Sequence, residues 1–311
     1  PENAVISLSD VGNIYQIPLL LQEQQVDTFI LEKLGRVLSK GDMSDWEHIV
    51  QVTAKHDVRL AMVGKYTDLK EAYKSLNESL AHAGIHTETR VHIEFIDAEQ
   101  LEANPSELLE HMDAVLIPGG FGDRGVEGKI KAIQHAREQG IPFLGICLGM
   151  QLALIEYARN VLGLADANSS EFNPDTENPI VSLISEWQDA TGKTEKRTKQ
   201  SDLGGSMRLG GQLCDLSEGS LVRNIYGTDQ IRERHRHRYE VNVDYREKLE
   251  AAGLKFSGLS PDGVLPEIVE IPGHPWFIGV QYHPELKSRP FDPHPLFKGF
   301  IGAAVERSRL V

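Results

Sequence analysis

Short apolar runs alternate with segments of helical periodicity from residue 58 onward, and this alternation limits the fold more than any other feature of the sequence. Strands are predicted at residues 58–63, 91–95, 114–117 and 142–146. Helices are predicted between them at residues 69–83 and 128–139. Because strands that alternate with helices form crossover units, we expect an α/β fold with a mostly parallel sheet and helices on both faces.

The pattern changes after residue 178, where the apolar runs become shorter and lie closer together. Such spacing is typical of hairpins, so we expect a smaller antiparallel portion in addition to the parallel sheet. A helix is predicted over residues 296–308, near the end of the chain.

The first 57 residues differ from the rest of the chain. A helix is predicted at residues 14–38, with apolar side chains on one face that a segment of this length cannot bury by itself. The stretch that follows, with Gly41 and Ser44, has the composition of a connection. We therefore predict an N-terminal segment at 1–34, an interdomain linker at 35–57 and a main domain at 58–311. The first residue is Pro1, with no initiator methionine, which suggests a piece of a longer protein.

The charge of the chain argues against a nucleic-acid partner. A formal net charge of −14 repels a phosphate backbone, and the arginines of residues 232–238 alternate with histidines and a glutamate in one short run. No apolar stretch is long enough to cross a bilayer, and the first 30 residues lack the layout of a signal peptide. We expect neither a nucleic-acid nor a membrane partner.

The chain contains two cysteines, Cys147 and Cys214, in different sequence contexts. A chain of 311 residues can bury a core without a disulfide. This cysteine usage predicts a reducing, cytoplasmic location. Cys214 has no motif around it and is interpreted as a small buried side chain.

Cys147 lies between Gly145 and Gly149, at the point where a predicted buried strand gives way to a helix. This is the arrangement of a nucleophile elbow, in which small neighbours permit a strained turn and expose the reactive atom. The N-terminus of the following helix would favour the thiolate. On this motif alone, a buried structural cysteine remains an equal alternative.

A thiolate nucleophile needs a base, and the base needs a group that orients it. His283 and Glu285 follow a predicted apolar strand and are separated by Pro284. In an extended segment the two side chains point to the same side, so the carboxylate can hold one imidazole nitrogen while the other faces Cys147. The sequence therefore predicts a Cys147–His283–Glu285 triad.

These motifs resemble those of class I glutamine amidotransferases, in the elbow at residues 145–151 and in the His-Pro-Glu sequence at residues 283–285. Within that class the chain is most similar to the CTP synthase family. That resemblance rests on residues 5–11, 14–18, 118–125, 204–210, 232–240 and 274–277. It covers nearly the whole chain.

Attack on an amide creates an oxyanion, which needs hydrogen-bond donors. The elbow geometry offers the backbone N–H of Leu148, and the side-chain-free loop at Gly119 and Gly120 can supply another donor. The resemblance adds contacts to glutamine. The predicted oxyanion and glutamine-binding residues are Gly119, Gly120, Leu148, Gly149, Met150, Gln151, Glu171 and Arg238. A guanidinium suits the carboxylate of glutamine and a carboxylate its ammonium group, although by itself Glu171 reads as a solvated loop acid.

The resemblance implies hydrolysis of L-glutamine through a glutamyl thioester, with release of ammonia. In the full-length enzymes of that family, a synthetase domain uses ATP and Mg²⁺ to activate UTP, ammonia then converts it to CTP, and GTP stimulates the glutaminase. Residues 1–34 would then be the tail of the synthetase domain, which is the expected partner within a homotetramer.

The chain itself is expected to hold no cofactor and no metal. His235 and His237 are two residues apart, but the arginines around them would repel a dication. Gly192-Lys193-Thr194 has the ending of a P-loop, yet Trp187 stands where the first glycine belongs, so a synthetase active site is not expected here.

Two alternatives stay open at the level of sequence. One is a different cysteine hydrolase on a similar sheet, which would cleave peptides or esters and not glutamine. The other is a noncatalytic assembly module.

Overall fold

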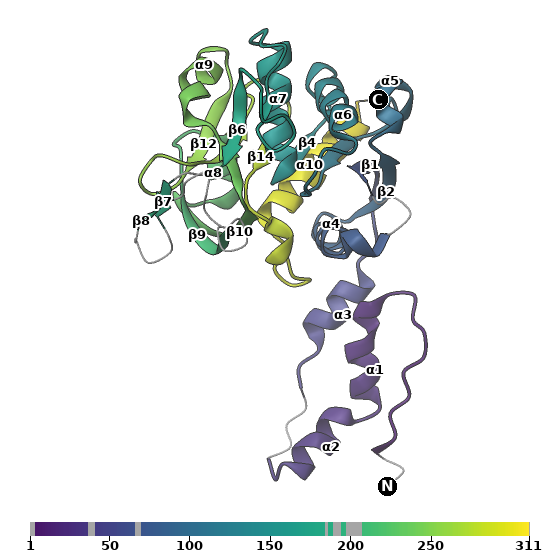
Figure 1. Cartoon of the computed structure of the whole chain (residues 1–311). Coiled ribbons are helices and arrows are strands. Elements are labelled where there is room, and N and C mark those ends of the chain that lie inside the picture. Colours follow the sequence, from purple (N-terminus) through teal and green to yellow (C-terminus); the bar gives the residue numbers. More distant parts are fainter. Residues whose placement is uncertain are drawn as a thin grey trace.

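The structure is a computed structural model and describes residues 4–36, 41–65, 70–183, 186–188, 194–196 and 207–310. A large domain contains most of the chain, and an N-terminal helical extension projects from it (Figure 1). Parts of three predicted features lie outside the described residues. They are residues 204–206 of the glycine-rich motif, residues 192–193 of the P-loop-like sequence and the end of the helix predicted at 14–38.

The main domain is built on a nine-stranded sheet with the order β10-β9-β12-β13-β14-β4-β3-β1-β2. Its strands are β1 His56–Gly64, β2 Thr89–Asp97, β3 Ala114–Ile117, β4 Phe143–Ile146, β9 Arg208–Leu216, β10 Gln230–His237, β12 Lys255–Leu259, β13 Pro266–Glu270 and β14 Phe277–Val280. The neighbours from β2 to β14 pair in parallel. The remaining neighbours, from β14 to β10, pair antiparallel. The predicted parallel sheet and the added antiparallel portion are both confirmed.

Helices cover both faces of this sheet, as predicted. They are α4 Lys74–His86, α5 Pro105–Leu109, α6 Val126–Glu138, α7 Leu148–Asn160, α8 Leu221–Tyr226, α9 Arg246–Ala251 and α10 Pro295–Ser308. The pleat separates two cores: Ala61 and Val63 face α5, α6 and α7, whereas Leu60 and Met62 face α4, α8 and α10. All four residues of β3 are buried, which explains their continuous apolar character.

A second, three-stranded sheet has the order β11-β6-β5. Its strands are β5 Asn168–Ser169, β6 Pro179–Leu183 and β11 Tyr239–Val241. β11 pairs antiparallel with β6, and β5 pairs with it in parallel. Strands β7 Glu186–Gln188 and β8 Thr194–Lys196 form a separate antiparallel pair. The short strands expected after residue 178 are thus present.

The N-terminal extension differs from the single helix predicted at 14–38. The segment forms a 3₁₀ turn, Ile14–Gln16, followed by α1 Ile17–Glu23 and α2 Val26–Lys33. Gln25 breaks the helix because its φ of 59° is left-handed. The predicted linker also contains a helix, α3 Ser44–Gln51. In α1 and α2, which are fully described, no residue is buried.

Aromatic side chains join the extension to the main domain. The hydroxyl of Tyr15 donates to Glu78 Oε2 at 2.7 Å, and burial together with this carboxylate raises the pKa of Tyr15 far above its usual value. The rings of Trp46 and Phe291 meet edge to face, with centroids 4.6 Å apart. The extension is therefore held at its α3 end, while α1 and α2 project away from the sheet (Figure 1).

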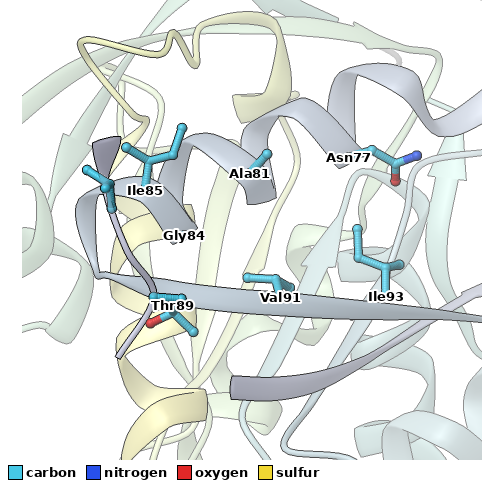
Figure 2. Close-up of a pocket in the computed structure, with 9 residues that line it drawn as sticks. Asn77, Ala81, Gly84, Ile85, Thr89, Val91 and Ile93 are labelled. Carbon is cyan, nitrogen blue, oxygen red and sulfur yellow. The ribbon is translucent and has the colours of Figure 1, made fainter. Parts of the chain in front are cut away.

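A cavity of about 260 Å³ lies between α4 and β2 (Figure 2). Its lining is mostly apolar and includes Ala81, Ile85, Val91 and Ile93. No residue of the predicted site lines it. No helix in the described part of the chain is long and apolar enough to cross a membrane.

Candidate active site

Three loops meet at the carboxyl edge of the parallel strands, and they carry the predicted catalytic residues. The glycine loop at Gly119 follows β3, Cys147 follows β4, and His283 follows β14. Because β4 lies between β3 and β14 in the sheet, the cysteine stands between the other two loops. The carboxyl ends of parallel strands are the usual position of ligand sites in such sheets.

Cys147 adopts the strained conformation expected of an elbow. Its φ of 53° and ψ of −103° lie in a region that residues other than glycine rarely occupy. A methyl group at Gly149 would lie 2.2 Å from the carbonyl oxygen of Ile117, and one at Gly145 would lie 2.7 Å from the backbone of Gly149. Both glycines are therefore required for the first turn of α7 to approach the sheet.

His283 is held by Glu285 and faces the cysteine. The imidazole Nδ1 and Glu285 Oε1 are 2.8 Å apart. Burial alone would lower the pKa of His283, but hydrogen bonds to Cys147 and Glu285, and the negative charge of both, raise it to about 10. A protonated imidazole is thus favoured beside the sulfur. A methyl group at Gly119 would lie 2.9 Å from His283 Cε1, so this glycine makes room for the ring.

Among the other predicted residues near the elbow, some can contact the substrate and others are buried in the core. Leu148 begins α7, where the first N–H groups have no partner within the helix and can face an oxyanion. Gly120 lies against the Leu148 side chain. Met150, in contrast, is fully buried in a core, so any contact with glutamine would come from its backbone.

The small sheet brings together the two predicted charged contacts. Glu171 follows β5 and Arg238 precedes β11, and both strands pair with β6. Burial raises the pKa of Tyr239, the nearby Glu171 charge raises it further and the Arg238 charge opposes the shift. Glu171 Oε1 accepts the backbone N–H of Gly122 at 3.1 Å, which connects it to the glycine loop. The carboxylate therefore lies against the glycine loop, and both charged groups lie near the hydroxyl of Tyr239.

Lys65, which follows β1, was not predicted from the sequence. Its ammonium group donates to the carbonyl oxygens of Phe121 and Gly122, at 2.7 Å and 3.0 Å. The glycine loop is thereby fixed from the neighbouring strand. The only sequence signal is a lysine directly after a strand that ends in glycine.

The side chains of His235 and His237, in β10, lie in the protein interior. His235 Nδ1 and His237 Nε2 are 2.9 Å apart and both side chains are buried. Burial and the nearby Arg208 charge hold the pKa of His235 well below its usual value. Arg208, from the motif at residues 204–210, is itself buried and pairs with Glu240 and Glu267. Among the described residues, no group of three or more His, Cys, Asp or Glu is placed to hold a metal ion.

The raised pKa of His283 predicts a titration that depends on Cys147. In a Cys147→Ala variant the pKa of His283 should fall clearly below about 10, because the strongest stabilising partner of the imidazolium is removed. NMR titration of the labelled imidazole measures this shift. Cys214→Ala is the matched control and should leave the pKa of His283 unchanged. An unchanged pKa in Cys147→Ala would contradict the contact between sulfur and imidazole.

The same shift affects stability. A histidine whose pKa is raised in the folded state stabilises the fold fully below its unfolded value, near 6.5. This contribution is lost as pH rises toward about 10.

The chain matches a known family model and solved structures. The family model described as glutamine amidotransferase class-I matches residues 68–303. The glutaminase domain of CTPS from Trypanosoma brucei, solved with bound acivicin, is 38% identical with a TM-score of 0.73, and the match covers 80% of this chain and 94% of that one. A glutamine amidotransferase from Thermotoga maritima is 13% identical with a TM-score of 0.43, over 80% of this chain and 97% of that one. The chain therefore belongs to the class I glutamine amidotransferases and is similar to the glutaminase domain of CTP synthase.

Proposed function

We propose that this chain hydrolyses L-glutamine to glutamate and ammonia, with Cys147 as the nucleophile, His283 as the proton carrier and Glu285 as its orienting group. The observation that carries the proposal is the strained Cys147 beside an imidazole whose pKa is raised to about 10. The similar Trypanosoma brucei domain was solved with acivicin, a glutamine analogue, which supports glutamine as the substrate.

The first half of the reaction forms a thioester. The Cys147 thiolate attacks the side-chain amide carbon, and the carbonyl oxygen becomes an oxyanion near the N–H of Leu148 and the glycine loop. Loss of one such donor costs about 2.7–4 kcal/mol in the best-studied enzymes. The imidazolium of His283 gives its proton to the leaving nitrogen, so ammonia departs and a neutral imidazole remains.

The second half regenerates the enzyme. Neutral His283 takes a proton from water, and the resulting hydroxide attacks the thioester carbon. Glutamate leaves, and the thiolate and imidazolium are restored. Glu285 forms no covalent bond and holds the ring by its Nδ1 throughout.

Arg238 and Glu171 are proposed to bind the two charged ends of glutamine. The Nε of Arg238 is buried and has no hydrogen-bond partner among the described residues. A bound α-carboxylate would satisfy it, because a guanidinium and a carboxylate form strong paired hydrogen bonds. Glu171 follows β5, at the opposite edge of the small sheet, and is proposed to accept the α-ammonium.

We further propose that the ammonia serves the amination of UTP to CTP, in a synthetase domain that uses ATP. The support is the similarity to a CTPS glutaminase domain over 94% of its length. Residues 1–34 are assigned to the tail of that synthetase domain and residues 35–57 to the linker, which fits the projection of α1 and α2 from the main domain (Figure 1).

Substitution of the three catalytic candidates tests the proposed hydrolysis. Cys147→Ala should reduce ammonia release by about 1,000-fold or more, with His283→Ala nearly as severe and Glu285→Gln milder. Ammonia release from glutamine is the assay, and a peptide and an ester substrate test for a different cysteine hydrolase. Cys214→Ala, which alters the other buried cysteine, should retain activity. Substantial ammonia release by Cys147→Ala would refute the assignment.

Replacement of Arg238 tests substrate binding. Arg238→Ala should raise KM for glutamine by about 10-fold or more while changing kcat little, because a carboxylate contact is made equally in the ground and transition states. Arg232→Ala changes an exposed arginine of the same segment and should leave KM unchanged. A loss confined to kcat would assign Arg238 to the transition state instead.

A product assay tests the assignment of the synthetase site to another domain. This chain, incubated with UTP, ATP, Mg²⁺ and either glutamine or ammonium chloride, should form no CTP. Ammonium bypasses the glutaminase and therefore probes the synthetase step alone. CTP formed from ammonium, detected by chromatography, would place a synthetase site within this chain.

A further inference from the structure

Gln281 follows β14 in the sequence, two residues before His283, and its side chain lies next to the reactive sulfur. It is fully buried, and its backbone N–H donates to the carbonyl oxygen of Glu267 at 2.9 Å. Its side-chain Nε2 lies 3.7 Å from Cys147 Sγ, within hydrogen-bond range for sulfur. A buried amide is costly without partners, so its position next to the nucleophile requires a physical reason.

A chain of hydrogen bonds runs from the small sheet to the sulfur. Gln151 Nε2 donates to the carbonyl oxygen of Tyr239 at 2.9 Å, and also to Gln281 Oε1 at 3.0 Å. Gln281 Nε2 then reaches Cys147. We call Gln151 and Gln281 the carboxamide relay.

The direction of this relay is fixed at one end. A backbone carbonyl can only accept, so the group of Gln151 that faces Tyr239 must be its NH₂. The atom of Gln281 beside that NH₂ must then be an oxygen. The remaining group of Gln281, the one that faces Cys147, is therefore an N–H donor and cannot turn around without breaking two hydrogen bonds.

We propose that Gln281 donates a hydrogen bond to the Cys147 thiolate and that Gln151 holds it in this orientation. The inference rests on the proposed role of Cys147 as the nucleophile. A thiolate accepts a hydrogen bond more strongly than a thiol does, so a fixed donor favours the ionised form. Gln281 thus complements His283 from a different direction and remains a donor whether the imidazole is protonated or neutral.

Alkylation of Cys147 tests this role without any substrate. The rate of reaction with iodoacetamide is followed against pH, and mass spectrometry assigns the modified peptide to Cys147. The Gln281→Met variant keeps the length of the side chain and removes the donor. In this variant the midpoint of the curve of alkylation rate against pH should move up by about one pH unit. The rate at pH values below both midpoints should fall about 10-fold. Ser257→Ala truncates another fully buried polar side chain, in β12, and should leave the midpoint in place.

A double-mutant cycle tests the relay itself. Gln151→Met should raise the midpoint less than Gln281→Met, because Gln281 is then free to reverse. The double variant should show no more than the shift of Gln281→Met alone, since both changes act through one hydrogen bond to sulfur. Additive shifts would overturn the relay, and an unchanged midpoint in Gln281→Met would overturn the donor itself.

These outcomes are distinct from those of the proposed function. If the unmodified chain releases no ammonia from glutamine but the midpoint shifts as described, the donor role stands and the glutaminase assignment fails. If ammonia is released and Gln281→Met does not move the midpoint, the glutaminase stands and the donor role fails. Circular dichroism and thermal unfolding verify that each variant is folded.

Discussion

The close approach of two backbones at the start of α7 is the constraint on which the site depends. Gly149 lies so near Ile117 that a single methyl group would collide with the carbonyl oxygen of that residue. This contact sets the height of α7 above the sheet, and the height forces Cys147 into its strained conformation with a positive φ. The N-terminus of α7 and the sulfur are therefore placed together by packing. The glycine loop and the loop of His283 then reach the sulfur because they follow β3 and β14, the two strands next to β4.

Much of the main domain was predictable because its signals are local. Buried parallel strands are continuously apolar, and the elbow and His-Pro-Glu motifs mark their own positions at strand ends. The break at Gln25 was not predictable, because a left-handed conformation outside glycine carries no reliable sequence signal. The helix α3 within the predicted linker was missed for a related reason, since its eight residues are too few for a clear periodicity.

The residues of the site that sequence reasoning could not place are those joined by long-range contacts. Glu171 and Arg238 belong to one small sheet only because β5 and β11 both pair with β6, and they were named by resemblance and not from their own surroundings. Lys65 depends on the adjacency of β1 and β3. Gln281 did carry a signal, a polar side chain directly after an apolar strand and two residues before the histidine, but its partner Gln151 is 130 residues away.

Strand β11 connects two functions that would otherwise be separate. The carbonyl of Tyr239 orients the carboxamide relay toward the sulfur, while the preceding residue supplies the guanidinium proposed for the α-carboxylate of glutamine. A displacement of this strand would therefore alter the donor to the thiolate and the substrate contact at the same time. Because Glu240, next in the strand, pairs with the buried Arg208, that displacement would also separate a buried ion pair, which is costly. The buried ion pair of Arg208 and Glu240 thus stabilises the position of β11, and with it the positions of the relay and of Arg238 relative to each other.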